Sequence, residues 1–443
     1  MIPPYASTEP LIFNMPALPL ELTDCIIDFV AILKVKRLRA NLAACSLVCR
    51  TWTRRSRHHF FKACRLLVSQ RNLLAFDALL RSPLCTILPH VRQLTLENNG
   101  GCRFDPLGDA LKLLPNMESL RLAGSEWGSH GAPPRRGFMT SLAGVVELEV
   151  NCADVGEFDH ALQVFCAFPS LRSLAIRGLT VTKDARWHTS PPPPFVPVHY
   201  VPPANVTLPQ SLSSLLIDAR ALIPIVHWLN WAGACHIRSL ELVLPPIEPQ
   251  NLTPLTQYVQ SLSGSLEHLT LCSSLSTLLE PAHLEHTFDL RAFTHLQTLR
   301  FNGLFPIGHL CPFERALPAI VTSVPPHTLQ RITFGLDGVR ADALPQLDWR
   351  AVDAALVDVP AVRFRGRTVP RPPPARTEDE VYDELETPEL HAMCVRDIHA
   401  ALPRAVARGA LDVAIDALKT AYVKRELRSW RNRYGFRVYA ALL

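Results

Sequence analysis

Residues 114–122 read "LPNMESLRL", which places apolar side chains at Leu114, Met117, Leu120 and Leu122. The closing alternation of apolar and polar residues is typical of a short strand that buries one face. The same spacing recurs in the stretches "LPHVRQLTL" (88–96), "LAGVVELEV" (142–150) and "FPSLRSLAI" (168–176). A strand that returns several times in one chain predicts a repeat architecture.

Weaker copies of this pattern continue along the chain. They are "LSSLLI" (212–217), "IRSLEL" (237–242), "LEHLTL" (266–271), "FTHLQTLRF" (293–301), "LQRITF" (329–334) and "LVDVPAVRF" (356–364), with a degraded copy "LDV" at 411–413. The second-to-last apolar residue serves as a marker for each full copy: Leu94, Leu120, Leu148, Leu174, Leu215, Leu240, Leu269, Leu299, Ile332 and Val362. Successive markers are 26, 28, 26, 41, 25, 29, 30, 33 and 30 residues apart, a period that chance alternation would not keep.

Amphipathic stretches lie between the strand copies. Examples are "DPLGDALKLL" (105–114), "EFDHALQVFCAF" (157–168), "TPLTQYVQSL" (253–262) and "PFERALPAIVTSV" (312–324). Asp105 and Thr253 each precede a proline, and a capping side chain followed by proline is typical of a helix start. Each unit is therefore expected to fold as strand, loop and helix, and the fold class is expected to be α/β.

This succession of units resembles the leucine-rich repeat, over about residues 88–413. The resemblance implies a horseshoe with strands on its inner side and helices on its outer side. We expect the solenoid to occupy residues 63–369, with a proline-rich insertion at 185–209 that leaves it as an extended loop. An irregular α/β domain with parallel strands is the alternative fold.

Residues 42–61, "LAACSLVCRTWTRRSRHHFF", are the most distinctive stretch near the N-terminus. We expect them to form one helix, with Leu42, Cys45, Cys49 and Trp52 on one face. Upstream, "LPLELTDCIIDFVAIL" (18–33) predicts a second amphipathic helix. Two such short helices cannot bury their apolar faces alone, so they need the repeats or another protein.

Together these stretches resemble the F-box over residues 16–62, through Leu-Pro-x-Glu-Leu, an Ile-Ile pair and Ser-Leu-Val-Cys-Arg-x-Trp. The resemblance implies a helical bundle that docks on the Skp-type adaptor of a cullin–RING (SCF-type) ubiquitin ligase, with cullin and RING subunits bound through the adaptor. The adaptor-facing residues that it implies are Leu18, Pro19, Leu22, Ile26, Ile27, Leu42, Cys45, Ser46, Val48, Cys49 and Trp52. The chain would then be the substrate-recognition subunit and would carry out no chemistry itself.

Other interpretations of the stretch at 42–61 are less favoured. Cys45 and Cys49 are four residues apart, but a structural zinc site needs four ligands, and the nearby cysteine and histidines add no recognised spacing. The cations could contact phosphates, yet charged runs are commoner on solvated helix faces, so we expect no nucleic acid. The connection "KVKRLRAN" (34–41) carries four cations, which favours the alternative of a degraded F-box on an interaction scaffold outside any ligase.

Residues that alternate with the buried strand positions must point to the inner surface of a horseshoe, where we expect the target protein to bind. They include Glu97, Arg121, Glu147, Glu149, Asn151, Arg177, Asp218, Glu241, His268, Arg300, Asn302, Arg331, Arg363 and Arg365. Because guanidinium groups pair bidentately with anions, Arg300, Arg331, Arg363 and Arg365 are the expected contacts to an acidic or phosphorylated segment of the target. The alternative is that these arginines face solvent or pair with nearby acids, such as "TEDEVYDELE" at 377–386.

Both ends of the chain are expected to lie outside the repeats. Residues 1–15 are expected to be disordered, and residues 370–443 to hold an acidic linker and a helical cap for the open end of the solenoid. Within them, a helical run is expected at 387–409, with Gly409 as its C-cap. The basic segment at 418–443 is expected to complete the cap, with a helix for a membrane surface or a partner as the alternative.

The bulk composition narrows the class of protein. The chain has 443 residues, a net charge of +5, 39 prolines and 12 cysteines without framework spacing. The N-terminus lacks a signal-peptide pattern and no apolar run reaches membrane length, so we expect free thiols, no membrane contact and a cytoplasmic and/or nuclear location. No phosphate loop, nucleophile elbow or metalloprotease motif occurs, so we expect no enzyme, no catalytic residue, no metal and no cofactor.

Overall fold

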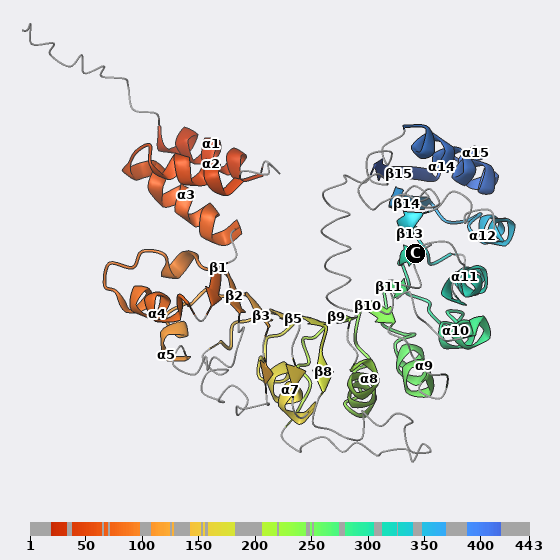
Figure 1. The fold of residues 1–443 in the computed structure, drawn as a ribbon, viewed down its shortest axis with the longest axis horizontal. Helices are drawn as coiled ribbons and strands as arrows, with labels where there is room; N and C mark the ends of the chain where they lie inside the picture. The colour runs from red at the N-terminus through yellow and green to blue at the C-terminus, as the bar shows by residue number, and fades with distance from the viewer. Residues whose placement is uncertain are drawn as a thin grey trace, which may run out of the picture.

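The chain folds as an α/β horseshoe in the computed structural model (Figure 1). The structure describes residues 19–32, 38–63, 66–69, 71–97, 108–124, 126–127, 142–151, 154–155, 158–181, 206–218, 221–244, 249, 252–273, 280–304, 312–325, 327–339, 348–368 and 388–417. Residues 1–15 and most of the insertion at 185–209 lie outside these ranges.

A twelve-stranded parallel sheet lines the inner side of the horseshoe. In spatial order its strands are β1 (Leu66–Ser69), β2 (Gln93–Glu97), β3 (Ser119–Ala123), β5 (Glu147–Asn151), β7 (Ser173–Arg177), β9 (Ser214–Asp218), β10 (Ser239–Leu244), β11 (His268–Ser273), β12 (Thr298–Leu304), β13 (Arg331–Val339), β14 (Ala361–Thr368) and β15 (Leu411–Ala417). A second sheet holds the two-residue strands β4 (Glu126–Trp127), β6 (Asp154–Val155) and β8 (Thr180–Val181).

Helices cover the outer side of this sheet (Figure 1). They are α4 (Leu73–Arg81), the 3₁₀ turn η1 (Leu88–His90), α5 (Gly108–Leu111), α7 (Phe158–Phe165), α8 (Leu222–Trp231), α9 (Leu252–Ser261), α10 (Pro281–Thr287), α11 (Pro312–Ser323), α12 (Trp349–Ala355), α14 (Pro388–Ala401) and α15 (Pro403–Ala407). Helix α9 begins one residue before Thr253, so Thr253 is not its N-cap as the sequence suggested. Asp105, the other expected cap, lies outside the described residues.

The strand register confirms the repeat that was read from the sequence. All ten markers are Cα partners of one another from β2 to β14, and Leu66 and Leu411 extend the row at its two ends. The 41-residue step does not interrupt it, since Leu174 pairs directly with Leu215. At the end of the insertion, Val206 is buried in the core, so the loop expected at 185–209 has returned to the solenoid by that residue.

The core lies between the sheet and the outer helices. The markers and the residues two positions after them are buried throughout β2 to β14, as period-two alternation requires. In the last units the second of these rows becomes aromatic: Phe334 stacks between Phe301 and Phe364 at ring distances of 5.8 Å and 4.8 Å, and Trp349 packs edge-on against it. Such ring pairs add about 0.5–1.5 kcal/mol each beyond the burial of their area.

The sheet continues past residue 369, where the solenoid was expected to end. The degraded copy at 411–413 forms β15, which pairs with β14, so α14, α15 and β15 act as a last unit of the array. Buried Asp353 of α12 accepts backbone hydrogen bonds from Arg404 and Ala405 at the start of α15. The helical run expected at 387–409 is divided into α14 and α15, and Arg408, not Gly409, is the C-cap of α15. Gly409 follows directly, at a φ of 66° in the left-handed region, and its amide donates to the Val406 carbonyl.

Three helices form a bundle before the sheet: α1 (Leu20–Ile32), α2 (Leu38–Ser46) and α3 (Arg50–Ala63). The single helix expected over residues 42–61 is wrong, because the chain turns between Ser46 and Arg50. The Ser46 hydroxyl bonds back to the Ala43 carbonyl at 2.6 Å, and the Thr53 hydroxyl donates to the Ser46 carbonyl at 2.8 Å. These bonds satisfy the carbonyl groups that the end of α2 leaves free.

The bundle is fixed to the N-terminal end of the solenoid through α3 (Figure 1). Arg57 Nη1 donates to the Thr86 hydroxyl at 2.8 Å, and the ring of His58 meets that of His90 in η1 at 5.6 Å. Burial and the cations Arg54 and Arg57 lower the pKa of His90. Among the described residues, the core cluster of the solenoid contains no residue of the bundle, so these polar contacts help to join the two parts.

Candidate interaction surfaces

The three-helix bundle exposes large apolar side chains on α1 and at the corner between α2 and α3. On α1, Leu22, Cys25, Ile26 and Phe29 follow helical spacing and form one stripe. The bundle surface, as we define it, consists of Leu22, Cys25, Ile26 and Phe29 of α1 together with Leu47, Val48 and Cys49 of the corner between α2 and α3. Leu22, Ile26 and Val48 are 52%, 40% and 61% exposed, which is unusual for side chains of this size.

The adaptor-facing residues implied by the sequence fall into several groups. Pro19, Leu22, Ile26, Val48 and Cys49 are exposed. Cys45, Ser46 and Trp52 are half-buried, and Leu18 lies outside the described residues.

Two residues of that set do not reach the surface. Ile27 and Leu42 are fully buried inside the bundle, so their expected contact with a partner is corrected to a packing role. The exposed side chains of Leu20, Phe29 and Leu47 were missing from the set. Phe29 was detectable from its helical spacing to Leu22 and Ile26, whereas Leu47 depends on the unexpected corner.

A charged cluster holds α1 against α3. Asp28 accepts two bonds from Arg55, each 2.6 Å long, and lies 2.7 Å from Nε2 of His59. The Arg55 guanidinium, with His59 as a further partner, lowers the pKa of Asp28 to about 2. Because a bidentate pair fixes both distance and orientation, this cluster sets how α1 lies on α3.

Cys49 is an exposed thiol at the corner that precedes α3. Its Sγ lies 3.0 Å from the Thr51 hydroxyl, and that bond, with backbone bonds from Trp52 and Thr51, lowers the pKa of the thiol. By contrast, burial alone raises the pKa of Cys166 to about 12. Cys49 is therefore the more reactive of the two thiols.

The second candidate surface is the inner face of the sheet, where three rows of side chains run across the strands. The row before the markers contains Gln93, Ser119, Glu147, Ser173, Ser214, Ser239, His268, Thr298, Arg331 and Ala361. The row after the markers contains Thr95, Arg121, Glu149, Ala175, Leu216, Glu241, Thr270, Arg300, Thr333, Arg363 and Asp412. Two residues further on lie Glu97, Ala123, Asn151, Arg177, Asp218, Val243, Cys272, Asn302, Gly335, Arg365 and Ala414.

Charges in the N-terminal half of this face largely pair with one another. Glu149 lies 3.3 Å from Arg121 and 3.5 Å from Arg177, so one carboxylate bridges arginines on both neighbouring strands. The middle of the face is uncharged at Ala175 and Leu216. The early acids that the sequence placed on this face are therefore partly neutralised by the adjacent strands.

The four predicted target-binding arginines lie together on β12, β13 and β14 but differ in their partners. Arg365 holds Asp412 of β15 in a bidentate pair, at 2.5 Å and 3.2 Å. Arg363 lies 3.6 Å from the same carboxylate. Arg365 and then Arg363 lower the pKa of Asp412. Within the described part of the chain, the exposed side chain of Arg331 has no hydrogen-bond or ion-pair partner.

A bulge in β12 positions the remaining arginine. The register shifts after Phe301, and Gly303 adopts a φ of 70°, in the left-handed region that favours glycine. The side-chain oxygen of Asn302 then accepts from Nε of Arg300 at 2.8 Å. Across the strands, a Cβ atom at Gly335 would come within 2.5 Å of that same oxygen, so glycine at 335 leaves room for Asn302.

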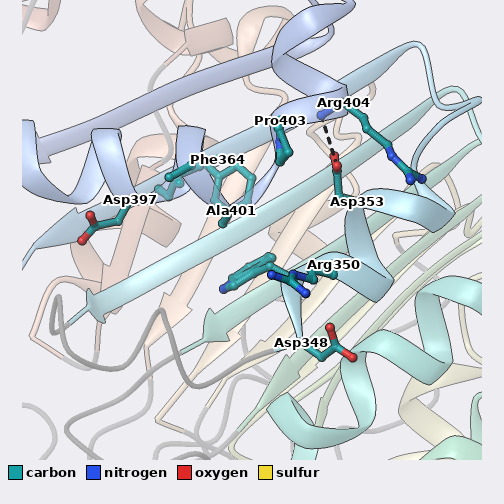
Figure 2. Close-up of a pocket in the computed structure, with 11 residues that line it drawn as sticks. Asp348, Arg350, Asp353, Phe364, Asp397, Ala401, Pro403 and Arg404 are labelled. Carbon is teal, nitrogen blue, oxygen red and sulfur yellow. Dashed lines mark hydrogen bonds between the residues drawn. The ribbon is translucent and has the colours of Figure 1, made fainter.

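The outer side of the last units carries an open groove of about 760 Å³, lined by residues of α12, β14, α14 and α15. Figure 2 shows Asp353 directed at the backbone of Arg404, where it caps α15. Asp348 likewise accepts from the Ala351 backbone amide as the N-cap of α12. Two of the three carboxylates in this groove are thus used for helix capping, which leaves no pair poised for acid–base chemistry.

Across the ranges that the structure describes, no three metal-ligating side chains converge on one point. None of the helices in those ranges combines the length and the apolar character that a membrane span requires. Both histidines of "HLEH" (283–286) belong to α10 and line a small hollow together with residues of α9.

Comparisons with known proteins assign no family to the chain. No protein-family profile matches it, and no curated protein is similar to it in sequence. Among solved structures, the leucine-rich repeat-containing protein LegL7 from Legionella pneumophila is 17% identical, with a TM-score of 0.37 over 78% of this chain and 94% of that one. A protein from Bacteroides fragilis is 13% identical, with a TM-score of 0.33 over 81% of this chain and 75% of that one. The repeat architecture of the chain is therefore established by the pairing of its own strands.

Proposed function

We propose that this chain is the substrate-recognition subunit of a cullin–RING ubiquitin ligase, with the bundle surface docked on a Skp-type adaptor. The observation that carries the proposal is the set of exposed apolar side chains on a bundle whose sequence resembles the F-box. Leu22, Ile26 and Val48 would lose water on docking, and apolar area of this kind is what stabilises protein interfaces.

The inner sheet is the proposed receptor for the target protein. Its three rows present side chains from eleven adjacent strands on one continuous surface, which suits an extended or curved partner. In this role the chain performs no bond chemistry. It would hold the target near a ubiquitin-charged enzyme, and such proximity alone contributes several kcal/mol to the rate, on the order of 7 or more in well-oriented cases.

The test is calorimetry of the full-length chain with a purified Skp-type adaptor. The variant Ile26→Asp/Val48→Asp places two charges in the bundle surface and is expected to weaken binding by more than about a hundredfold, since buried interface residues commonly contribute roughly 2 kcal/mol each. The matched control is Leu74→Asp/Leu84→Asp, which alters two side chains of the solenoid that are 79% and 86% exposed. Equal affinity for wild type and the bundle variant would refute the docking surface.

A second candidate function is an interaction scaffold outside any ligase. The observation that favours it is the basic stretch "KVKRLRAN" at 34–41, whose four cations follow α1 in the sequence of the proposed docking region. A folded wild-type chain that does not bind the adaptor in calorimetry would favour this second function. The solenoid would then be the interacting part on its own.

A further inference from the structure

We propose that the C-terminal part of the inner sheet binds a short acidic segment of a protein partner, rich in Asp and Glu. This deepens the proposed role of the sheet as a target receptor, but it concerns the solenoid alone and does not require adaptor docking. The binding surface, named here the arginine–threonine surface, consists of Thr270, Thr298, Arg300, Arg331, Thr333 and Arg363.

The register interleaves cations with hydroxyl groups on this surface. Thr333 is the direct Cα partner of both Arg300 and Arg363, so an arginine stands on each side of it. Arg331 lies two residues before Thr333 on the same strand, on the same face, and pairs with Thr298. Three arginines are therefore next to Thr333 on the sheet, and guanidinium and hydroxyl groups are both donors suited to carboxylates.

The cations of this surface remain available to a ligand. Arg365 takes up Asp412 through two short bonds, whereas Arg363 reaches it only at 3.6 Å. Arg300 uses Nε for the 2.8 Å bond to Asn302, which leaves its two terminal amino groups for another partner. Because Asn302 is itself fixed by the bulge at Gly303, Arg300 is oriented before any ligand arrives, which lowers the entropy cost of binding.

Neighbouring acids limit the length of the ligand. Glu241 of β10 lies on one side of the surface, and Asp412 of β15 lies on the other. The four strands between them, β11 to β14, span about 15 Å at the usual strand spacing of roughly 4.8 Å. An extended peptide covers that distance with about five residues. A longer polyanion would meet a carboxylate at each end of the surface.

The same surroundings favour a peptide over a nucleic acid. The three inner rows of the described strands contain no Phe, Tyr or Trp, so a base finds no ring on which to stack. A duplex would also extend over Glu241 and Asp412, where like charges repel it. A short run of carboxylates matches both the charge and the extent of the surface.

The test uses the full-length chain and a fluorescein-labelled peptide with five consecutive glutamates between Gly-Ser flanks, followed by anisotropy. Wild type is expected to bind it, with affinity that falls as salt is raised. The variant Arg300→Gln/Arg331→Gln/Arg363→Gln is expected to bind at least about a hundredfold more weakly, at roughly tenfold for each lost charge-assisted contact. Wild-type affinity in this variant would overturn the proposal.

A matched control separates the surface from general electrostatics. Arg172→Gln/Arg350→Gln/Arg396→Gln removes the same charge at exposed positions outside the inner rows and is expected to bind as wild type does. An equal loss in this control would overturn the proposal. Tighter binding of a five-nucleotide single-stranded DNA of similar charge would also overturn it, in favour of a nucleic-acid ligand.

Two further variants test the bundle surface and the acidic segment of the chain in the same assay. Ile26→Asp/Val48→Asp is expected to bind the peptide normally, so a failure of adaptor docking leaves this proposal intact. The second variant changes the acids of "TEDEVYDELE" (377–386) to their amides. Peptide binding that occurs only in this second variant would overturn the proposal, in favour of an occupant from the chain's own sequence.

Discussion

Replacement of Gly335 by alanine tests whether the bulge of β12 depends on an empty position in β13. The added Cβ would lie 2.5 Å from the side-chain oxygen of Asn302, 3.0 Å from the carbonyl oxygen of Phe301 and 3.2 Å from the Asn302 Cα. Two of these three atoms belong to the backbone of the bulge, so no rotamer change removes all of the contacts. Either β12 or β13 must shift.

The expected magnitude is the difference between two effects. Overpacking a buried site costs about 1–3 kcal/mol. Alanine also restricts the unfolded chain, which offsets about 0.4–1 kcal/mol of that cost where the backbone conformation suits it. We therefore expect Gly335→Ala to lower the free energy of unfolding by about 1–2 kcal/mol. Displacement of Asn302 should also free Arg300 and weaken binding of the acidic peptide several-fold.

Urea unfolding of the full-length chain measures the first effect, and a double-mutant cycle assigns it to Asn302. In an Asn302→Ala background the contact at 2.5 Å disappears, and the contacts with the backbone of β12 remain. The cost of Gly335→Ala should then fall by about 1 kcal/mol, a typical coupling between residues in contact. Gly264→Ala is the matched control, because a Cβ at that position meets no atom within 4 Å.

Two outcomes would refute this reasoning. One is a Gly335→Ala chain as stable as the Gly264→Ala chain, which would mean that the strands absorb the added atom freely. The other is an equal cost of Gly335→Ala with and without Asn302, which would place the strain in the backbone rather than in the amide that holds Arg300.

Three other predictions follow from described contacts. Asp353→Ala should lower the free energy of unfolding by about 1–2 kcal/mol, because it removes the buried cap of α15. Asp353→Asn should recover part of the lost stability. Equal stability of wild type and both variants in urea would contradict the capping role. Since Arg55 depresses the folded-state pKa of Asp28 to about 2, the stability from this pair is fully present above pH 4 and is lost as pH falls from about 4 towards 2. Acid unfolding of Asp28→Asn should lack that part of the pH dependence, and identical acid profiles would contradict it. Iodoacetamide at neutral pH should label the exposed Cys49 much faster than the half-buried Cys166 in the native chain, as measured by mass spectrometry. Similar rates would show that exposure and pKa do not control labelling.

The solenoid could be predicted from the sequence because its signal is local and repeated. Eight of the ten markers are followed by one polar and one apolar residue, and the other two, Leu174 and Leu215, are followed by two apolar residues; in every unit the residue two positions after the marker is apolar, as a strand with one buried face requires. The first strand, "LLVS" at 66–69, was missed although Phe60 and Ala63 stand at the preceding apolar positions, because those residues belong to the stretch that was assigned to the N-terminal helices. The last strand was recognised only as "LDV", although β15 runs to Ala417.

Features that depend on contacts between distant residues could not be predicted in this way. The apolar residues Leu47 and Val48 favour an uninterrupted helix, and the corner that replaces it depends on hydroxyl bonds from Ser46 and Thr53. Similarly, Asp412 lies 47 positions from Arg365 in the chain, and only the register of β14 and β15 brings the two together. The sequence therefore placed the arginines on the correct face without showing which of them is already paired.

The curved array of units also determines how far apart its two ends lie. The three-helix bundle and the last helices, α14 and α15, stand at opposite ends of the horseshoe (Figure 1). Each unit adds about 4.8 Å of sheet along the arc and a small rotation, so the number of units sets the gap between the two ends. Removal of one unit would leave the chemistry of each surface intact and alter the distance and angle between them. Two proteins held at the two ends would then face each other at a different distance and angle, so the number of repeat units would set their relative position.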